Sequence, residues 1–328
     1  MRSMLTVFRK ELSDDFTSLR FLILFGLVLL AGIFSIYTAA TTIQQTIGAA
    51  SEAGTFVSES ATQFVFLKLF TTTSDVLSTS FLTFTVFFIP IVGIALGFDA
   101  INSERSSGTL SRLLAQPVYR DDVINGKFLA GVLTISIMLV SIVLLVAGIS
   151  VRIIGIPPTA EEIIRLMGFI ALGIIYGAFW LGLSMLFSVL VRRIATSALA
   201  SIAIWIICVF FISMIANSIA SLIAPLGQSS TIAAQLHNFN INLNIMRTSP
   251  VFLFQEASSM LLSPDARTLS QLVQIQTQGL EAWMLPSPLS LTQSLLAVWP
   301  QIVSLIAFTV ISFAISYIRF MREEIRST

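Results

Sequence analysis

Six long apolar segments divide this chain, and none of them contains a charged residue. They are Phe21–Tyr37, Thr79–Phe98, Phe128–Val151, Leu166–Val191, Ala195–Ile219 and Val298–Ile318. A transmembrane helix needs about 20 apolar residues, whereas a membrane strand needs about half as many and alternates apolar with polar positions. The pattern therefore predicts an all-α polytopic membrane protein with six transmembrane helices.

The residues before the first apolar segment predict a further helix. Residues 1–20 place apolar side chains at spacings of three and four, with Leu5, Phe8, Leu12, Phe16 and Leu19 on one face. That spacing indicates an amphipathic helix. It lies either in the membrane interface or packed on the bundle, and the sequence leaves both readings open.

The remaining chain divides at the ends of the apolar segments. Residues 21–220 hold helices 1–5 with a polar loop at 99–127, residues 221–297 form an external segment, and residues 298–328 hold the last helix and a tail. Within the external segment, His237–Asn244 alternates polar and apolar residues with a period of two, which predicts a strand.

The distribution of Lys and Arg predicts the orientation in the membrane. Thirteen of the 18 lie on the side of the two termini and of loop 99–127, and five lie on the other side. Because positive charge marks the cytoplasmic side, both termini and the loop are expected to be cytoplasmic. Cleavage of the first span as a signal peptide is an alternative. The length of that span and the acidic residues before it argue against cleavage.

Composition agrees with a membrane protein and excludes several functions. Hydrophobic residues make up 55% of the chain, the mean hydropathy is +0.92 and the net charge is +1, so there is no basic face for nucleic acid. One cysteine, Cys208, and one histidine, His237, cannot form a disulfide framework or a Cys/His metal site. The sequence has no phosphate-binding loop and no catalytic motif, which predicts a non-enzymatic chain without its own cofactor.

The loop 99–127 carries eight of the 35 charged residues and a distinctive pattern. It contains Glu104-Arg105, Gly108-Thr109-Leu110, Leu113-Leu114, Pro117-Val118, Arg120 and Gly126-Lys127. The spacing resembles the cytoplasmic loop of type-2 ATP-binding-cassette (ABC) permeases, and the opening Val7–Leu12 looks like the start of such permeases. Tyr119 departs from the small residue that many relatives have there. The order of elements is most similar to the permeases grouped with nitrous-oxide-reductase maturation.

This resemblance implies a role for the loop. The Ser, Thr, Gly and Pro residues of the loop themselves predict a short helix, Thr109–Ala115, with Asp121 capping the helix that follows. The resemblance implies that this short helix is a coupling helix that docks in a separate ABC ATPase subunit. The docking residues are expected to be Glu104, Arg105, Gly108, Thr109, Leu110, Arg112, Leu113, Leu114, Pro117 and Arg120. A solvated turn with ordinary caps is the alternative.

The resemblance also implies an assembly and a location. The chain would be the permease subunit of an exporter in a prokaryotic inner membrane. It would pair as a homodimer with two copies of the ATPase, which would hold the ATP and magnesium. A membrane scaffold that acts on an external protein through residues 221–297 is an alternative, and a secondary carrier or channel is a weaker one. The centres of the six spans lack the ionisable residues typical of such carriers.

Two further patterns concern the fourth span. Gly173, Gly177 and Gly182 predict close helix packing, either within the chain or between two copies. Glu161 and Glu162, with Arg165, are expected to begin this span, because negative charge is favoured at a helix N-terminus.

Overall fold

The computed structural model describes residues 2–52, 64–73, 80–109, 119–155, 157–225, 231–263 and 289–322, and these ranges are helical with no strand. The described helices are α1 (Arg2–Thr17), α2 (Leu19–Glu52), α4 (Val65–Thr71), α5 (Phe81–Gly97), α6 (Asn102–Ser106), α8 (Arg120–Ile154), α9 (Ala160–Leu190), α10 (Ile194–Ile206), the π-helix η1 (Ile207–Phe211), α11 (Ile212–Ile223), α12 (Ile232–Met246), α13 (Pro250–Leu262) and α15 (Leu291–Arg322).

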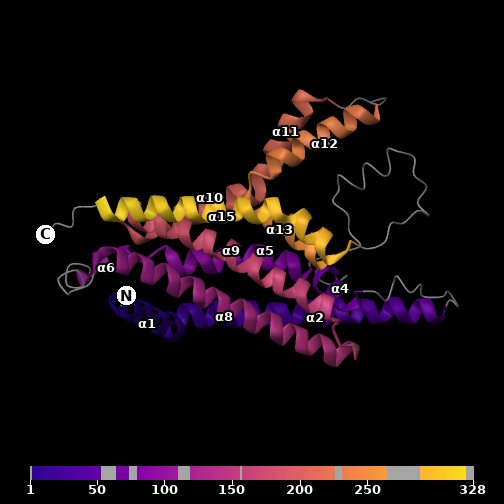
Figure 1. Cartoon of the computed structure of the whole chain (residues 1–328), viewed down its shortest axis with the longest axis horizontal. Helices are drawn as coiled ribbons and strands as arrows, with labels where there is room; N and C mark the ends of the chain where they lie inside the picture. The colour runs from indigo at the N-terminus through magenta and orange to yellow at the C-terminus, as the bar shows by residue number, and fades with distance from the viewer. Residues whose placement is uncertain are drawn as a thin grey trace.

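Six segments in these ranges are long and apolar enough to cross a membrane. They are Leu19–Gln45, Phe81–Ser106, Arg120–Ile153, Ala160–Leu190, Ile194–Ile223 and Leu291–Arg322. Each overlaps one predicted span, so the all-α fold with six spans is confirmed. Figure 1 shows the start of α1, the end of α15 and α6 at the same end of the bundle. We call this the near end and the opposite one the far end.

Helix α9 is the centre of the bundle and packs against α5, α8, α13 and α15. Its Tyr176 and Trp180 are fully buried. The ring of Tyr176 stacks on Phe254 of α13 with a centroid distance of 4.3 Å, and its hydroxyl donates to the Val86 carbonyl at 3.1 Å. A buried hydroxyl in a membrane needs such a protein partner, because no water is available.

Glycines allow α5 and α9 to approach closely. A Cβ at Gly93 of α5 would lie 2.9 Å from the carbonyl oxygen of Gly177, which is closer than real Cβ contacts. A Cβ at Gly97 would lie 2.8 Å from the carbonyl oxygen of Leu181 and would overlap the hydroxyl of Ser184. Only a residue without a Cβ fits at this crossing.

The three glycines of α9 that the sequence singles out all pack within the chain. A Cβ at Gly173 would lie 3.2 Å from Leu139, one at Gly177 would lie 2.8 Å from Ile135, and one at Gly182 would lie 3.7 Å from the backbone nitrogen of Phe313. Their neighbours come from α8 and α15, with Ile89 of α5 beside the first two. Gly173 and Gly177 therefore serve close helix contacts inside one subunit, whereas a Cβ at Gly182 would make ordinary van der Waals contacts.

The predicted strand His237–Asn244 is wrong, because these residues lie in α12. In this alternation Asn238 and Asn242 are four residues apart, as are Asn240 and Asn244. Residues four apart share a helix face. Asn238 donates to the carbonyl oxygens of Ala220 and Ala224 at 2.9 and 2.7 Å. Asn242 donates to the side chain of Asn217 at 2.6 Å. The alternation thus supplies the contacts that close an α11–α12 hairpin.

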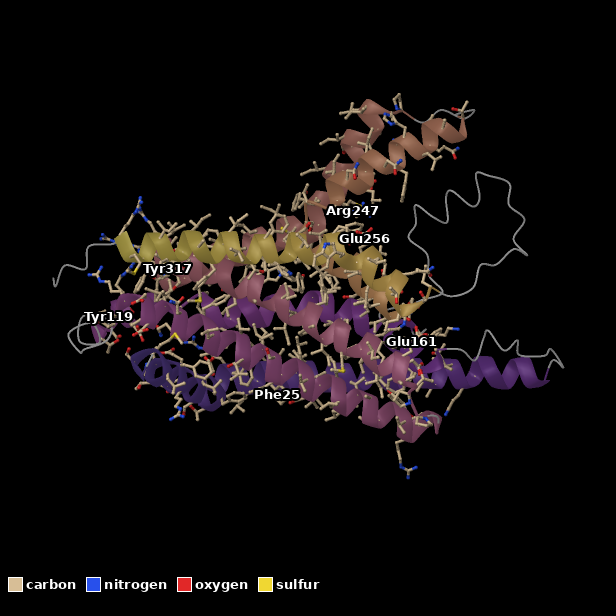
Figure 2. All side chains as sticks on the ribbon, in the orientation of Figure 1. Phe25, Tyr119, Glu161, Arg247, Glu256 and Tyr317 are labelled. Atoms are coloured by element: carbon tan, nitrogen blue, oxygen red, sulfur yellow. The ribbon has the colours of Figure 1, made fainter. Side chains whose placement is uncertain are left out.

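Part of the predicted external segment 221–297 packs into the bundle. Helix α13 buries Val251, Leu253, Phe254 and Ala257 and lies against α9 and α15. Its Glu256 accepts two bonds from Arg247, at 2.7 and 3.0 Å, and one from Gln301 of α15, at 2.9 Å. These bonds join the base of the hairpin to the bundle, and Figure 2 labels Arg247 and Glu256 there.

A fully buried arginine holds the far end together. Arg165 of α9 forms an ion pair with Glu161 at 2.8 Å. It also donates to the Leu289 carbonyl at 2.7 Å and to the Ser294 hydroxyl at 2.9 Å. The predicted acidic start of this helix is confirmed, because Thr159 and Glu162 form a reciprocal capping box.

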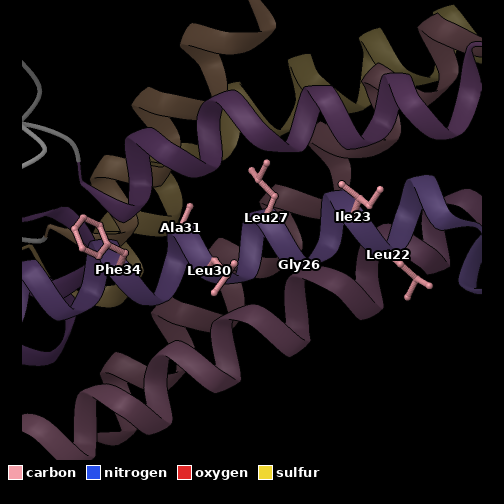
Figure 3. A pocket seen from close by; sticks show the side chains of 7 residues that line it. All are labelled: Leu22, Ile23, Gly26, Leu27, Leu30, Ala31 and Phe34. Carbon is pink, nitrogen blue, oxygen red and sulfur yellow. The ribbon is translucent and has the colours of Figure 1, made fainter.

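Two apolar depressions involve α2. An open groove on its exposed side is lined by Leu22, Ile23, Gly26, Leu27, Leu30, Ala31 and Phe34 (Figure 3). A smaller cavity between α2, α5 and α8 is lined in part by Phe81, Phe84 and Phe88. The open groove has the composition of a lipid-facing helix surface, whereas the smaller cavity belongs to the interior of the bundle.

The crossing of α5 and α9 predicts a contrast between two glycine substitutions. Gly97→Ala should lower the stability of the purified chain by about 1–3 kcal/mol, because the added methyl group meets backbone that cannot move aside. Gly148→Ala should leave stability unchanged or slightly higher, because no atom lies within 4 Å of the added carbon. Thermal unfolding midpoints in detergent measure both, and equal shifts would contradict the packing described.

Candidate functional site

Four charged side chains meet at the near end of the bundle. Lys127 of α8 lies 2.8 Å from Glu11 of α1 and 3.0 Å from Glu104 of α6. Lys10 of α1 lies 3.7 Å from Glu104 and 2.9 Å from Glu11. We call these four residues the charge cluster. Lys127 and Glu104 are buried, so each depends on the other members for the stabilisation that water would otherwise supply.

A glycine brings α1 close enough to α8 for the cluster to form. A Cβ at Gly126 would lie 3.0 Å from the Val7 side chain and 3.3 Å from the Met4 carbonyl oxygen. On either side of this contact, Ser3 donates to Asp122, and Thr134 donates to Asp15 at 3.0 Å. The N-terminal helix is therefore packed along α8, as one of the two readings of residues 1–20 expected.

Hydroxyl groups fix α6 on the neighbouring helices. Ser188 of α9 accepts the backbone N–H groups of Ile101 and Asn102 at 3.0 and 3.1 Å. Ser197 of α10 donates to the Phe98 carbonyl at 2.8 Å. The turn between α5 and α6 is thus attached to α9 and α10, while Glu104 attaches α6 itself to α1 and α8.

The carboxyl groups of α1 respond to this environment in opposite directions. Burial alone would raise the pKa of Glu11, but the charge and hydrogen bonds of Lys127 and Lys10 hold it below its usual value. Burial raises the pKa of Asp15 to about 6, partly offset by the bond from Thr134. Glu11 therefore favours the folded state as an anion, whereas Asp15 favours it in the protonated form, and that contribution is lost as the pH rises through about 6.

The structure places five of the predicted docking residues. Glu104 points into the charge cluster, and Arg105 lies in the last turn of α6. Gly108 adopts a positive φ of 68°, and the Thr109 hydroxyl donates back to the Glu104 carbonyl at 3.2 Å. Arg120 is the first residue of α8.

The other predicted docking residues lie outside the described residues. These are Leu110, Arg112, Leu113, Leu114 and Pro117, so the coupling helix Thr109–Ala115 stays a prediction. The predicted cap of the following helix is wrong, because Tyr119 occupies the N-cap without a side-chain bond and Asp121 lies in the first turn.

The α1 side of this site has no recognisable signal in the sequence. Lys10 and Glu11 were visible only as charges on an amphipathic helix, and nothing in the sequence showed which residues they meet. Lys127 is the last residue of the loop pattern. Its salt bridge to Glu11, more than 100 positions away, has no signal in the neighbouring sequence. Ser188 lies in an apolar segment, where a lone hydroxyl looks unimportant.

Within the described ranges, no group of three or more His, Cys, Asp or Glu residues could hold a metal ion. The charge cluster is made of paired cations and anions, which neutralise one another. Its geometry suits a structural connection between α1, α6 and α8 better than a reactive centre.

Comparison with known families agrees with the fold. The family model described as ABC-2 family transporter protein matches residues 5–325, and the chain therefore belongs to that family. A comparison with curated proteins gave no significant match. The chain is thus a transmembrane permease of the ABC transporter class. Members of this family are typically non-catalytic subunits. Membership of the family implies an ABC ATPase subunit as partner.

The burial of Lys127 predicts a strong contrast with Lys10. Lys127→Met removes the buried cation from between two carboxylates and leaves them only the exposed Lys10, which should lower stability by about 3 kcal/mol. Lys10→Met should cost less than about 1 kcal/mol, because its side chain is 53% exposed and its pairs are screened by solvent. Thermal unfolding in detergent measures both. Equal losses would show that the buried pairing does not hold these helices together.

Proposed function

We propose that this chain is the membrane subunit of an ABC exporter. Two copies pair as a homodimer, and each copy receives one ATPase subunit on loop 99–127 at the near end. The positive charge on this side supports a cytoplasmic location for the loop and both termini, as in a prokaryotic inner membrane. ATP and magnesium would belong to the partner, in keeping with the lack of a phosphate-binding loop in this sequence.

The observation that carries this proposal is the attachment of α6 at the base of the loop. Glu104 joins it to α1 and α8, and Ser188 joins it to α9. A force applied to the loop therefore reaches three helices directly. By contrast, a loop that was only a solvated connection would need no buried ion pairs at its base, because these carry a desolvation cost.

Closure of two ATPase subunits around ATP would pull the two loops together. The helices joined by the charge cluster would then move with α6 as one body and change the opening between the two copies. The small-residue contact of α5 with α9 would carry this movement toward the far end. The order of elements favours the nitrous-oxide-reductase-maturation group of permeases.

The docking assignment predicts a selective loss of the partner. Arg112→Glu with Leu113→Asp should weaken association with the ABC ATPase at least about tenfold, equivalent to about 1.4 kcal/mol, because both residues fall in the proposed contact. Arg9→Glu is the matched control, since Arg9 is an exposed near-end cation on α1. The measurement is the amount of ATPase that co-purifies with the full chain in detergent.

Normal membrane insertion of the double variant would show that the loss is local. Equal retention of the ATPase by the double variant and by wild type would reject loop 99–127 as the docking site. The chain purified without its partner should hydrolyse no ATP.

A further inference from the structure

Asn102, the first residue of α6, is a fully buried amide without a hydrogen-bond partner among the described residues. Its exposed fraction is 0%, and both its side-chain nitrogen and its side-chain oxygen are unpaired. Buried amides in proteins are almost always hydrogen-bonded, because removing such a group from water without a partner lowers stability. The unpaired amide therefore raises the free energy of the helix arrangement that the structure shows, which we call the resting arrangement.

The neighbouring polar groups do not share this property. Ser197 donates to the Phe98 carbonyl, and Lys127 has its carboxylate partners. Within the described ranges the other buried amide is Gln301, and its nitrogen donates to Glu256, which leaves only its oxygen unpaired. Asn102 is thus the one buried amide of these ranges that makes no side-chain bond at all.

The contacts that fix α6 leave the Asn102 amide unpaired. The backbone N–H groups of Ile101 and Asn102 donate to the Ser188 hydroxyl at 3.0 and 3.1 Å. On the other side of the short helix, one oxygen of Glu104 meets Lys127 and Lys10. The second oxygen of Glu104 is also buried and has no partner within the described residues. Helix α6 is therefore firmly held, although two of its polar side chains keep unused hydrogen-bonding capacity.

Unused capacity on α6 matters because of where this helix lies. It forms the base of loop 99–127, and it is joined to α1, α8 and α9. Packed helices change position between discrete arrangements. A group that is unpaired in one arrangement and paired in another favours the second one, and so it lowers the free energy needed to leave the first.

We propose that Asn102 is the residue that sets the balance between two arrangements of the near end. Its amide is unpaired in the resting arrangement and gains hydrogen-bond partners when α6 and the helices attached to it move with loop 99–127. Asn102 is a positioning residue, since it acts through the movement of α6. This inference rests on the proposed function, because it takes the ATPase subunit as the source of the movement.

Asn102→Leu tests the proposal, because leucine replaces the amide with an apolar group of nearly the same shape. The thermal unfolding midpoint of the purified chain in detergent should rise by about 2 °C or more, since the unpaired group is gone. ATP hydrolysis by the co-purified permease–ATPase complex should fall about three- to tenfold, because only the resting arrangement has been stabilised. A residue with a purely structural role would lose stability and activity together.

Two further variants complete the experiment. Asn102→Ala removes the amide without adding bulk, so it should not lower the midpoint and should also slow hydrolysis, even if leucine overfills the site. Ser258→Ala is the matched control, because the Ser258 hydroxyl is likewise buried and unpaired but belongs to α13. This control should keep the midpoint and the wild-type rate of hydrolysis.

Lower midpoints for both Asn102 variants would show that the amide is paired in the resting arrangement, for example by a buried water molecule, and would overturn the proposal. A raised midpoint with the wild-type rate of hydrolysis would show that no second arrangement depends on the amide, and would overturn it equally. Failure of the ATPase to co-purify with the wild-type chain would contradict the proposed function instead.

Discussion

Lys127 is buried at the near end of the bundle, and an ammonium group in that position must be neutralised by the protein. Glu11 and Glu104 supply the two carboxylates, one from α1 and one from α6. Gly126 keeps α1 close enough for Glu11 to reach Lys127, because a Cβ there would lie 3.0 Å from the Val7 side chain of α1. The position of α1, the position of α6 and the start of the loop all follow from this one pairing requirement.

The same requirement makes the near end a stiff part of the molecule. The bonds that the backbone N–H groups of Ile101 and Asn102 donate to Ser188 hold α6 on α9, and the crossing at Gly93 and Gly97 leaves no space between α5 and α9. Packed interiors have discrete arrangements and do not deform continuously, so a displacement of the loop would shift these helices together. The far end is different, because two separate polar groups join the helices there. Arg165 of α9 donates to Leu289 and Ser294 at the start of α15, and Glu256 of α13 accepts from Gln301 of α15.

The number and type of spanning helices could be predicted because an apolar run of about 20 residues has few other solutions in a membrane. The strand at His237–Asn244 failed for a physical reason. A period of two also places every second asparagine on one helix face. Two of these asparagines donate hydrogen bonds to α11, and nothing in the sequence showed that α11 packs beside them. The end of α6 could be located from Ser106, Ser107 and Gly108, whereas the start of α8 could not, because Tyr119 and not Asp121 occupies its N-cap. The role of Glu104 could not be predicted, since its partners Lys10 and Glu11 belong to a distant helix.

The claim that α1, α6 and α8 act as one body can be tested by locking two of them together. Ser3 and Asp122 are in hydrogen-bonding contact, so cysteines at both positions, in a Cys208→Ala background, should form a disulfide between α1 and α8. The measurement is ATP hydrolysis by the co-purified permease–ATPase complex before and after oxidation. A single rigid body predicts efficient cross-linking and the same rate in both states. A rate that falls on oxidation and recovers with reductant would show that α1 must move relative to α8 and would contradict the account.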